Sequence, residues 1–342
     1  MTEPQTDSAD PAQHVLQLAT GYVVSTALQL AVQLGVADHL AAAPRTAREL
    51  AAATGANEDA LYRVLRALSS VGVFDEVAPR RFALTPAADL LRKDAPRSIH
   101  DLVLFIADPL HLRVYADAIE SVRTGRPAAE VTLGMPVFEY FAKHPEYSEV
   151  FNNAMTTFSG AIVPAVLEAY DFGSIGTLVD VAGGHGQLLT SILRQYPKMR
   201  GVLMDLDHVV AGAHRQVEAA GVSDRCQIVA GDFFKAVPPG GDAYVMKSII
   251  HDWDDDRAAQ ILRSIHTAMG SARGIVLLLE GVIAAGNEPS LGKVMDLEML
   301  LMPGGRERSA DEFRTLFDRA GFDLMRIVPT QSPVSVIEAR KR

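Results

Sequence analysis

A glycine-rich turn with an acidic residue behind it is the strongest chemical signal in this sequence. The apolar run 178–182 leads into Gly183, Gly184 and Gly186. Small residues in such a turn let a ligand approach the backbone, and parallel sheets bind ligands beyond the carboxyl ends of their strands. Asp205 stands 19 residues after Gly186, where a carboxylate can hold both hydroxyls of a ribose. The pattern predicts a site for a nucleoside cofactor.

The residue three positions after Gly186 distinguishes a dinucleotide from a simpler nucleoside cofactor. A dinucleotide fingerprint needs a third glycine three positions after Gly186, and this chain has Leu189 there. The NAD fingerprint therefore fails. A nucleoside without a pyrophosphate does not need close helix packing around phosphate, which makes S-adenosylmethionine the better candidate.

Three titratable residues could take part in proton transfer. His251 lies at an expected strand-to-helix junction, and an imidazole with an ordinary pKa of about 6.5 suits a general base. Glu280 ends the apolar run 276–279, where a carboxylate is costly unless it has a partner or lies near water. Glu307 lies between two arginines. Taken from the residues alone, His251 could also be a simple turn residue and Glu307 part of an exposed ion-pair cluster.

The second half of the chain must position these residues on a sheet. From residue 174 onward, short β-rich runs alternate with amphipathic helical segments, which is typical of a parallel sheet with crossover helices. No helix separates the last two expected strands, so we expect them to form an antiparallel hairpin. The strands are expected near residues 177–182, 201–204, 226–230, 243–247, 274–279, 323–328 and 334–339.

The acidic run 252–256 has two interpretations. It could bind magnesium, but further ligands at a recognised spacing are missing. Asp254 instead precedes a segment with apolar residues at helical spacing, and two more acidic residues follow it in the first turn. We therefore expect a helix cap here and no metal.

The amino-terminal part of the chain is rich in Ala and Leu and predicts helices. Residues 46–50, a turn at Gly55 and residues 57–68 predict a helix-turn-helix, and the short strands that follow resemble a wing. A DNA-reading second helix should be basic, but Arg63 and Arg66 are balanced by Glu58 and Asp59. A platform for dimerisation or for one wall of a pocket is the favoured interpretation.

Composition limits the remaining classes. The chain has 342 residues, enough for two domains, and Cys226 is its one cysteine, so no internal disulfide can form. A formal charge of −10 disfavours nucleic acid as a partner. The amino terminus lacks the pattern of a signal peptide, and no apolar run reaches the length of a membrane span. We expect a cytoplasmic protein with neither a membrane nor a nucleic acid as its partner.

Five motifs together resemble a known family. They are residues 180–186, 204–209, 231–234, 246–253 and 304–308, and they occur in the family's order and spacing. The sequence is similar over nearly its whole length to the S-adenosylmethionine-dependent O-methyltransferases of the caffeic acid, hydroxyindole and bacterial polyketide-tailoring type. The resemblance implies a Rossmann-like class I methyltransferase α/β sheet with helices on both faces, and an all-helical winged-helix dimerisation domain. It implies domains at residues 1–95 and 171–342, with a helical linker and acceptor-pocket region at 96–170.

The resemblance also implies a set of cofactor-binding residues. Those of the glycine turn would follow the amino acid portion of S-adenosylmethionine, Asp205 would hold its ribose, and Asp232 and Phe233 would contact its adenine. The family usually has glycine where this chain has Ala182, a change that costs little if the φ of Ala182 is negative. The full set is Ser159, Ala182, Gly183, Gly184, Asp205, Leu206, Gly231, Asp232, Phe233, Lys247 and Ser248.

For the reaction, the resemblance implies that His251 is the general base, Glu307 its carboxylate partner and Glu280 a residue flanking the acceptor. The product would be S-adenosylhomocysteine together with a methylated phenol of a small aromatic or polyketide-type metabolite. We expect the acceptor pocket between the two domains. Its expected walls are Met155, Phe158, Asp252, Trp253, Met299 and Met302.

Three alternatives stay open at this point. Some relatives with this architecture bind the cofactor without methylating and run a hydroxylase or decarboxylase type of reaction. A winged-helix transcription regulator with a ligand-sensing domain is disfavoured by the neutral second helix, and a nicotinamide oxidoreductase by Leu189. The apolar residues of the first helices are best explained by a two-fold partner, so we expect a homodimer.

Overall fold

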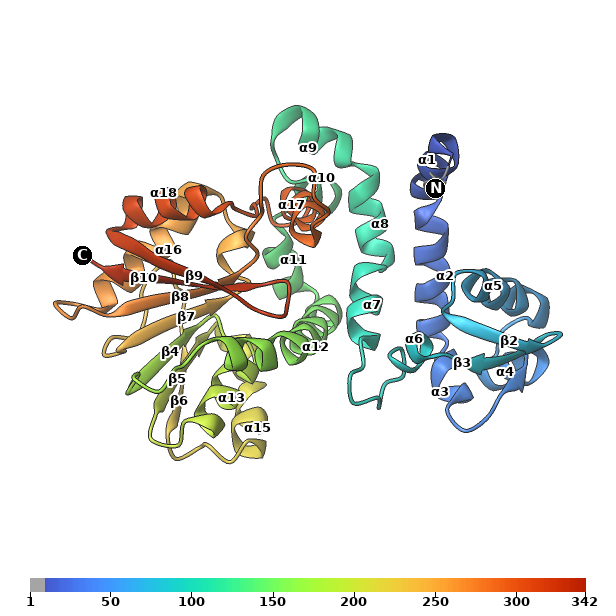
Figure 1. Cartoon of the computed structure of the whole chain (residues 1–342), viewed down its shortest axis with the longest axis horizontal. Coiled ribbons are helices and arrows are strands. Elements are labelled where there is room, and N and C mark those ends of the chain that lie inside the picture. Colours follow the sequence, from blue (N-terminus) through green and yellow to red (C-terminus); the bar gives the residue numbers. More distant parts are fainter. Residues whose placement is uncertain (1–9) are drawn as a thin grey trace, which may run out of the picture. The chain divides into compact units, whose positions relative to one another are not determined.

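The computed structural model describes residues 10–342, and this part of the chain forms two compact units. The first unit ends at Leu112 and the second begins at Arg113 (Figure 1). This boundary lies later in the chain than residue 95, where the sequence predicts the end of the amino-terminal domain. The further division at residue 170 stays a prediction.

The first unit combines helices with a small antiparallel sheet. The order of its strands is β1-β3-β2, so the description of this domain as all-helical needs correction. The strands are β1 (Arg45–Thr46), β2 (Phe74–Ala78) and β3 (Arg81–Leu84). The helices are α1 (Pro11–Ala19), α2 (Gly21–Gln33), α3 (Val36–Leu40), α4 (Ala47–Thr54), α5 (Glu58–Ser70), α6 (Pro86–Asp89) and α7 (His100–Ile106).

The helix-turn-helix forms where the sequence predicts it. Thr46 caps α4, and Gly55 ends that helix in a left-handed conformation with a φ of 71°. Asn57 then accepts hydrogen bonds from the first turn of α5. Because α5 is amphipathic, one of its faces packs into the core beside the hairpin of β2 and β3; the core residues from this face are Leu61, Leu65 and Leu68. The identification of this unit as a winged helix stays a prediction.

The second unit is built on a seven-stranded sheet of order β6-β5-β4-β7-β8-β10-β9. Strands β4 to β8 are parallel, and β10 pairs antiparallel with both β8 and β9, as the missing helix between the last two strands predicts. The strands are β4 (Thr177–Val181), β5 (Arg200–Asp205), β6 (Cys226–Ala230), β7 (Ala243–Lys247), β8 (Ile275–Glu280), β9 (Phe322–Pro329) and β10 (Ser335–Lys341).

Both faces of this sheet are covered by helices (Figure 1). Successive residues of a strand point to opposite faces, so Leu277 and Leu279 belong to one core, whereas Val276 and Leu278 belong to the other. The first core is covered by α12 (Pro145–Ala169), α13 (Gln187–Gln195) and α15 (Ala213–Ala219). The second is covered by α16 (Asp255–Ala268) and α18 (Ala310–Ala320).

Shorter helices complete the unit. Of these, α9 and α10 contact α17, and the single turn η1 follows β7 directly. Helix α8 runs across the boundary between the two units. These elements are α8 (Pro109–Ala116), α9 (Ala118–Thr124), α10 (Ala128–Leu133), α11 (Val137–Lys143), α14 (Asp207–Val210), η1 (Ile250–Asp252) and α17 (Leu291–Leu301).

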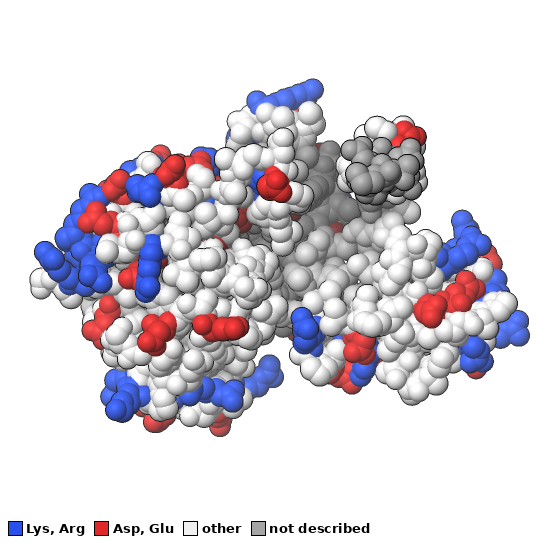
Figure 2. Space-filling model, in the orientation of Figure 1, with Lys and Arg blue, Asp and Glu red and all other residues white. Residues whose placement is uncertain are grey.

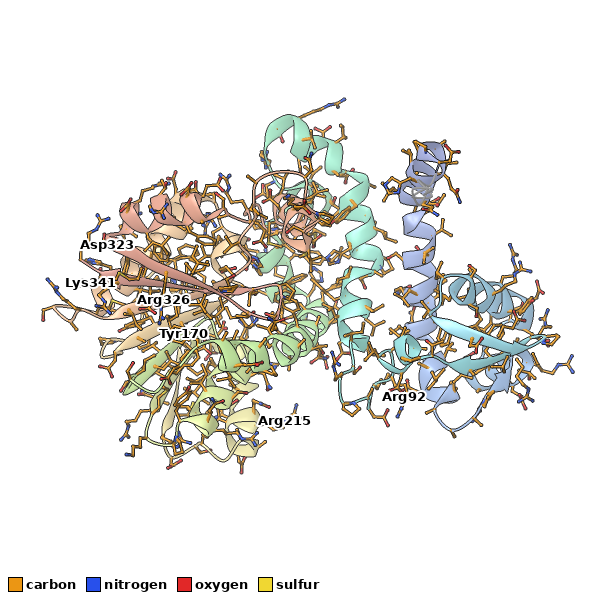
Figure 3. All side chains as sticks on the ribbon, viewed as in Figure 1. Arg92, Tyr170, Arg215, Asp323, Arg326 and Lys341 are labelled. Atoms are coloured by element: carbon orange, nitrogen blue, oxygen red, sulfur yellow. The ribbon has the colours of Figure 1, made fainter. Side chains whose placement is uncertain are left out.

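Helix α12 is anchored to the sheet at its carboxyl end. The hydroxyl of Tyr170 donates a hydrogen bond of 2.9 Å to Glu338 of β10. Arg326 of β9 lies 2.8 Å from the same carboxylate oxygen, and its guanidinium lies over the Tyr170 ring (Figure 3). Burial raises the pKa of Tyr170, so the hydroxyl keeps its proton for this bond. The anchor fixes a helix that contributes several residues to the cavity described below.

Two segments are long and apolar enough to cross a membrane by length and composition: α12, and the bent pair of α1 and α2. Helix α12 contributes Ile162, Val163 and Val166 to the first core of the second unit. A core helix of this kind meets the same criteria of length and hydropathy, and we interpret α12 as one.

Candidate functional site

A cavity of about 500 Å³ lies at the carboxyl ends of the parallel strands. Residues at the ends of β4, β5 and β7 line it, as do residues that follow β6, and α11 and α12 close it from the other side. Every lining residue lies between Phe138 and Arg257, within the second unit. This is the position at which open parallel sheets bind ligands.

The structure brings the predicted cofactor residues together. All eleven line this one cavity, although they come from five separate segments of the chain. They are Ser159, Ala182, Gly183, Gly184, Asp205, Leu206, Gly231, Asp232, Phe233, Lys247 and Ser248. Their individual roles stay predictions.

The glycine turn is shaped by Asp205. One carboxylate oxygen of Asp205 accepts a hydrogen bond of 2.8 Å from the amide of Gly184, and the other accepts one of 2.7 Å from Leu206. A Cβ atom on Gly183 would lie 2.4 Å from Leu203 and 2.6 Å from Asp180. Glycine at this position therefore lets the turn pack closely against β4 and β5.

Ala182 does not have the negative φ at which alanine would replace glycine without strain. Its φ is 60°, in the left-handed region, where a Cβ atom costs roughly 1–2 kcal/mol. Ser248, at the end of β7, is also left-handed, with a φ of 54°. Both strained residues line the cavity, which is where such strain is commonly found.

An acidic and a basic side chain, Asp180 and Lys247, line the cavity and influence each other's pKa. Burial raises the pKa of Asp180 to about 7, against the opposing effect of Lys247. Burial lowers the pKa of Lys247, against the effect of Asp180 and two further carboxylates. One carboxylate oxygen of Asp180 is buried without a hydrogen-bond partner. These groups leave hydrogen-bonding capacity at the cavity for a polar ligand.

An aromatic wall closes one side of the cavity. The ring centroids of Phe233 and Trp253 lie 6.1 Å apart, and Phe138 lies 5.9 Å from Trp253. Arg257 lies over the rings of Phe234 and Trp253, 4.4 and 4.5 Å from their centroids. Nothing in the sequence indicates that Phe138 and Arg257 line the cavity, because their helical spacing does not distinguish a pocket wall from an ordinary helix face.

The predicted acceptor walls separate into two groups. Met155, Asp252 and Trp253 line the cavity. The other three residues are not among its lining. Phe158 packs against the first core, with its ring 5.8 Å from the ammonium of Lys247, and the buried Met299 and Met302 lie at the end of α17.

Beside the cavity, one imidazole is surrounded by carboxylates. Nδ1 of His251 lies 2.8 Å from Oε1 of Glu307 and 3.6 Å from Oε2 of Glu280. Nε2, on the other side of the ring, lies 3.5 Å from the carboxylate of Asp252. Glu280 is fully buried and the His251 side chain is 15% exposed. His251 does not line the cavity, whereas Asp252 does. Asp252 therefore lies between the imidazole ring and the cavity.

The charges of this cluster decide its protonation. Burial alone would lower the pKa of His251, but Glu280, Asp252 and Glu307 outweigh it and raise the pKa to about 10. Burial raises the pKa of Glu280, and it raises that of Asp252 to about 7. The ring therefore keeps its proton on Nδ1, and this N–H group donates a hydrogen bond to the Glu307 carboxylate.

Glu280 also has a second role that the sequence does not indicate. Its Oε1 accepts hydrogen bonds from the amides of Ile249 and Ile250, at 3.0 and 2.8 Å. Glu280, His251 and Glu307 offer atoms within 4.8 Å of one another that could hold a metal ion. The ring nitrogen that faces these carboxylates is already engaged with Glu307, so the geometry is that of a hydrogen-bonded pair.

The known proteins to which this chain is similar are O-methyltransferases. A family model for the O-methyltransferase domain matches residues 115–323, and one for the O-methyltransferase dimerisation domain matches residues 16–94. The phenazine O-methyltransferase PhzM of Lysobacter antibioticus is 45% identical, over 99% of this chain and 99% of that protein.

Solved structures agree over the whole length. The crystal structure of LaPhzM has a TM-score of 0.93 at 44% identity and covers 98% of this chain and all of that one. A second structure, of the O-methyltransferase NcsB1 from neocarzinostatin biosynthesis, has a TM-score of 0.83 at 35% identity, over 97% and 99% of the two chains. That structure was determined in complex with S-adenosylmethionine and 2-hydroxy-5-methyl naphthoic acid.

The left-handed conformation of Ala182 can be tested by Ala182→Gly. Glycine relieves the strain but adds entropy to the unfolded chain, so the free energy of unfolding should rise by up to about 1 kcal/mol. Urea denaturation measures the change. The control is Ala161→Gly at an exposed position inside α12, where the same replacement should lower stability by roughly 0.5–1 kcal/mol. An equal loss at both positions would show that Ala182 is not strained.

Proposed function

This chain belongs to the O-methyltransferase family, and we propose that it transfers a methyl group from S-adenosylmethionine to a phenolic hydroxyl of a small aromatic or polyketide-type metabolite. The observation that supports this most strongly is the position of the His251–Glu307 pair. It lies next to the cavity that collects all eleven predicted cofactor residues. The fold is the predicted Rossmann-like methyltransferase sheet with an amino-terminal dimerisation domain.

The cavity residues fit S-adenosylmethionine. Ala182, Gly183 and Gly184 line the cavity, where their backbone can meet the amino acid portion of the molecule. The carboxylate of Asp205 can bind ribose hydroxyls, and Phe233 and Trp253 offer flat apolar surfaces to an adenine. The unpartnered oxygen of Asp180 is a further acceptor at the same site.

The chain's own residues would position the hydroxyl and take its proton. When bound, S-adenosylmethionine supplies a methyl group that is already activated, so orientation and proton removal are what the protein adds. We assign proton removal to Nε2 of His251, because Nδ1 is held by Glu307. Asp252 extends from the cavity lining to within 3.5 Å of that nitrogen and would guide the hydroxyl to it.

The lining supports a flat aromatic acceptor. Phe138, Phe141, Phe151 and Met155 line the cavity together with Trp253, and such side chains suit a conjugated ring. One relative is named for a phenazine, and another was solved with a naphthoic acid. Hydroxylated phenazines and hydroxynaphthoic acids are therefore the first acceptors to try.

The other classes have less support. Figure 2 shows acidic and basic side chains interspersed over the visible face. Arg48 and Arg80 pair with Glu58 at the start of α5, so these arginines are not free for phosphate. We propose a cytoplasmic enzyme that acts without nucleic acid or membrane. A diverged, non-methylating reaction is the alternative that the acceptor assay must exclude.

We also propose that the dimerisation domain joins two copies of this chain. Helices α1 and α2 expose a series of large apolar side chains, as a two-fold interface requires; these are Val15, Leu16, Leu18, Tyr22 and Val23. The protein should sediment as a dimer at micromolar concentration. A monomer under these conditions would contradict the proposal.

Cofactor binding is tested by calorimetry. The protein should bind S-adenosylmethionine and S-adenosylhomocysteine and should not bind NAD. Asp205→Ala should weaken binding by about 1.5–3 kcal/mol, since hydrogen bonds to a charged group are lost. The control is Asp207→Ala, which removes a carboxylate two residues later at the start of α14; this residue does not line the cavity. Tight NAD binding, or equal effects of the two variants, would contradict the assignment.

Proton transfer is tested by His251→Ala. Turnover of a phenolic acceptor should fall by roughly 10²- to 10⁴-fold while the affinity for S-adenosylmethionine stays nearly unchanged, because base catalysis acts in the transition state. An acceptor that is already ionised at the assay pH needs no base and should partly rescue this variant. Methylation of a neutral phenol at the wild-type rate would show that His251 is only a turn residue.

The same proposal predicts a pH dependence. A base works only when it is deprotonated, so a raised pKa of His251 places the rising part of the rate profile above the ordinary value of about 6.5. Glu307→Gln removes a charge that holds the proton on the ring, so the rising part should move to lower pH. An unchanged profile in this variant would separate Glu307 from the base.

A further inference from the structure

Arg308 is a buried cation that the proposed reaction does not use. Its side chain is only 1% exposed, and it is among the largest fully buried side chains of the described residues. Such a charge is costly to bury unless all its donors are satisfied. All the nitrogen atoms of the Arg308 guanidinium donate hydrogen bonds, and their acceptors lie close to His251 in the fold.

The guanidinium binds the backbone on both sides of His251. Nη1 donates to the carbonyl of Ile250 at 3.0 Å, and Nη2 donates to that of Trp253 at 2.8 Å. Nε donates to Asp255, the first residue of α16, at 2.9 Å, and Nη1 lies 3.3 Å from the carbonyl of Arg306. Two of these four acceptors, the carbonyls of Ile250 and Trp253, lie on either side of His251 in the chain.

The turn that carries His251 has two backbone hydrogen bonds of its own, from Asp252 to Ile249 and from Trp253 to Ile250. The η1 segment is a single 3₁₀ turn of three residues, which supplies few hydrogen bonds of its own. The amides at its start are bound by Glu280, whereas the carbonyls of Ile250 and Trp253 are bound by Arg308. Glu280 therefore holds the start of the turn, and Arg308 binds it on both sides of His251.

Arg308 also connects this turn to the segment that carries Glu307. The amide of Arg306 donates to the carbonyl of His251 at 2.8 Å. The backbone of Gly305 packs so closely that a Cβ atom there would lie 2.0 Å from the same carbonyl oxygen. Glu307 lies between these contacts and Arg308. The distance between His251 and Glu307 thus depends on how these two backbone segments are held together.

We propose that Arg308 is a positioning residue for proton transfer: it clamps the His251 turn onto the Glu307 segment and so fixes the ring against its carboxylate partner. This inference rests on the proposed role of His251 as the base. Its direct carboxylate partner is Asp255, outside the imidazole cluster. Arg308 therefore acts through backbone geometry.

The test compares Arg308→Met and Arg308→Lys with Arg319→Met. Arg319 pairs with Asp256 on the same helix as Asp255 but lies outside the cavity and the imidazole cluster. Arg308→Met should lower kcat for a neutral phenol by about 10- to 100-fold, as expected for a misplaced catalytic group. The affinity for S-adenosylmethionine should change less than about twofold. Arg308→Lys should recover part of the rate, and Arg319→Met should match wild type.

Two readouts separate positioning from general stability. The loss in Arg308→Met should shrink with an acceptor that is already ionised. Adding Arg308→Met to His251→Ala should cause no further loss, because both changes act on the same step. An equal loss on both acceptors, an additive loss in the double variant or an unchanged kcat would overturn the proposal.

If Arg308→Met does not fold, as judged by circular dichroism, Arg308→Lys and Asp255→Asn decide the question by the same criteria. A wild-type protein that methylates no acceptor would count against the proposed function but not against the role of Arg308. A measurement that needs no turnover tests that role in this case. The Nδ1 proton signal of His251 in NMR should move in Arg308→Lys and stay in place in Arg319→Met. A signal that is unmoved in every Arg308 variant would overturn the clamp.

Discussion

The contact between the His251 ring and the carboxylates behind it is the interaction on which the rest of the site depends. A fully buried Glu280 and a nearly buried Glu307 each require polar partners. The His251 ring is hydrogen-bonded to Glu307 and lies near Glu280, which also accepts hydrogen bonds from two backbone amides. That requirement fixes the distance between two chain segments 56 residues apart in sequence. The absence of a side chain at Gly281, where a Cβ atom would lie 2.9 Å from Glu307, follows from the same requirement.

The sheet brings this cluster and the cofactor cavity together through the register of its strands. Strands β4 and β5 end at the glycine turn and Asp205, and β7 and β8 end at the His251 turn and Glu280. Because β4 lies between β5 and β7, the two sets of residues occupy neighbouring positions along one edge. Binding and proton transfer are thus separate groups of residues on a common rigid support, so substitutions can affect one without the other.

The sequence predicts the elements whose signals are local. The order of strand and helix, the helix-turn-helix and the cap at Asp254 all depend on spacing within a few residues, and the structure confirms them. The sequence does not indicate the left-handed φ of Ala182 or the hydrogen bonds of Arg308, since both depend on segments that come together only in the fold. Phe158, Met299 and Met302 show the same limit: a methionine or aromatic residue at helical spacing looks alike in a core and in a pocket wall.

The protonation of the His251 ring can be measured directly by NMR with ¹⁵N-labelled histidine across a pH titration, with His251→Asn to assign its signals. We expect a proton that stays on Nδ1 and a pKa well above the ordinary value of about 6.5, because three carboxylates surround the ring. Glu307→Gln should bring this pKa down. A wild-type ring that titrates near its ordinary value, or whose proton lies on Nε2 when neutral, would contradict the arrangement from which the rest of the site is argued.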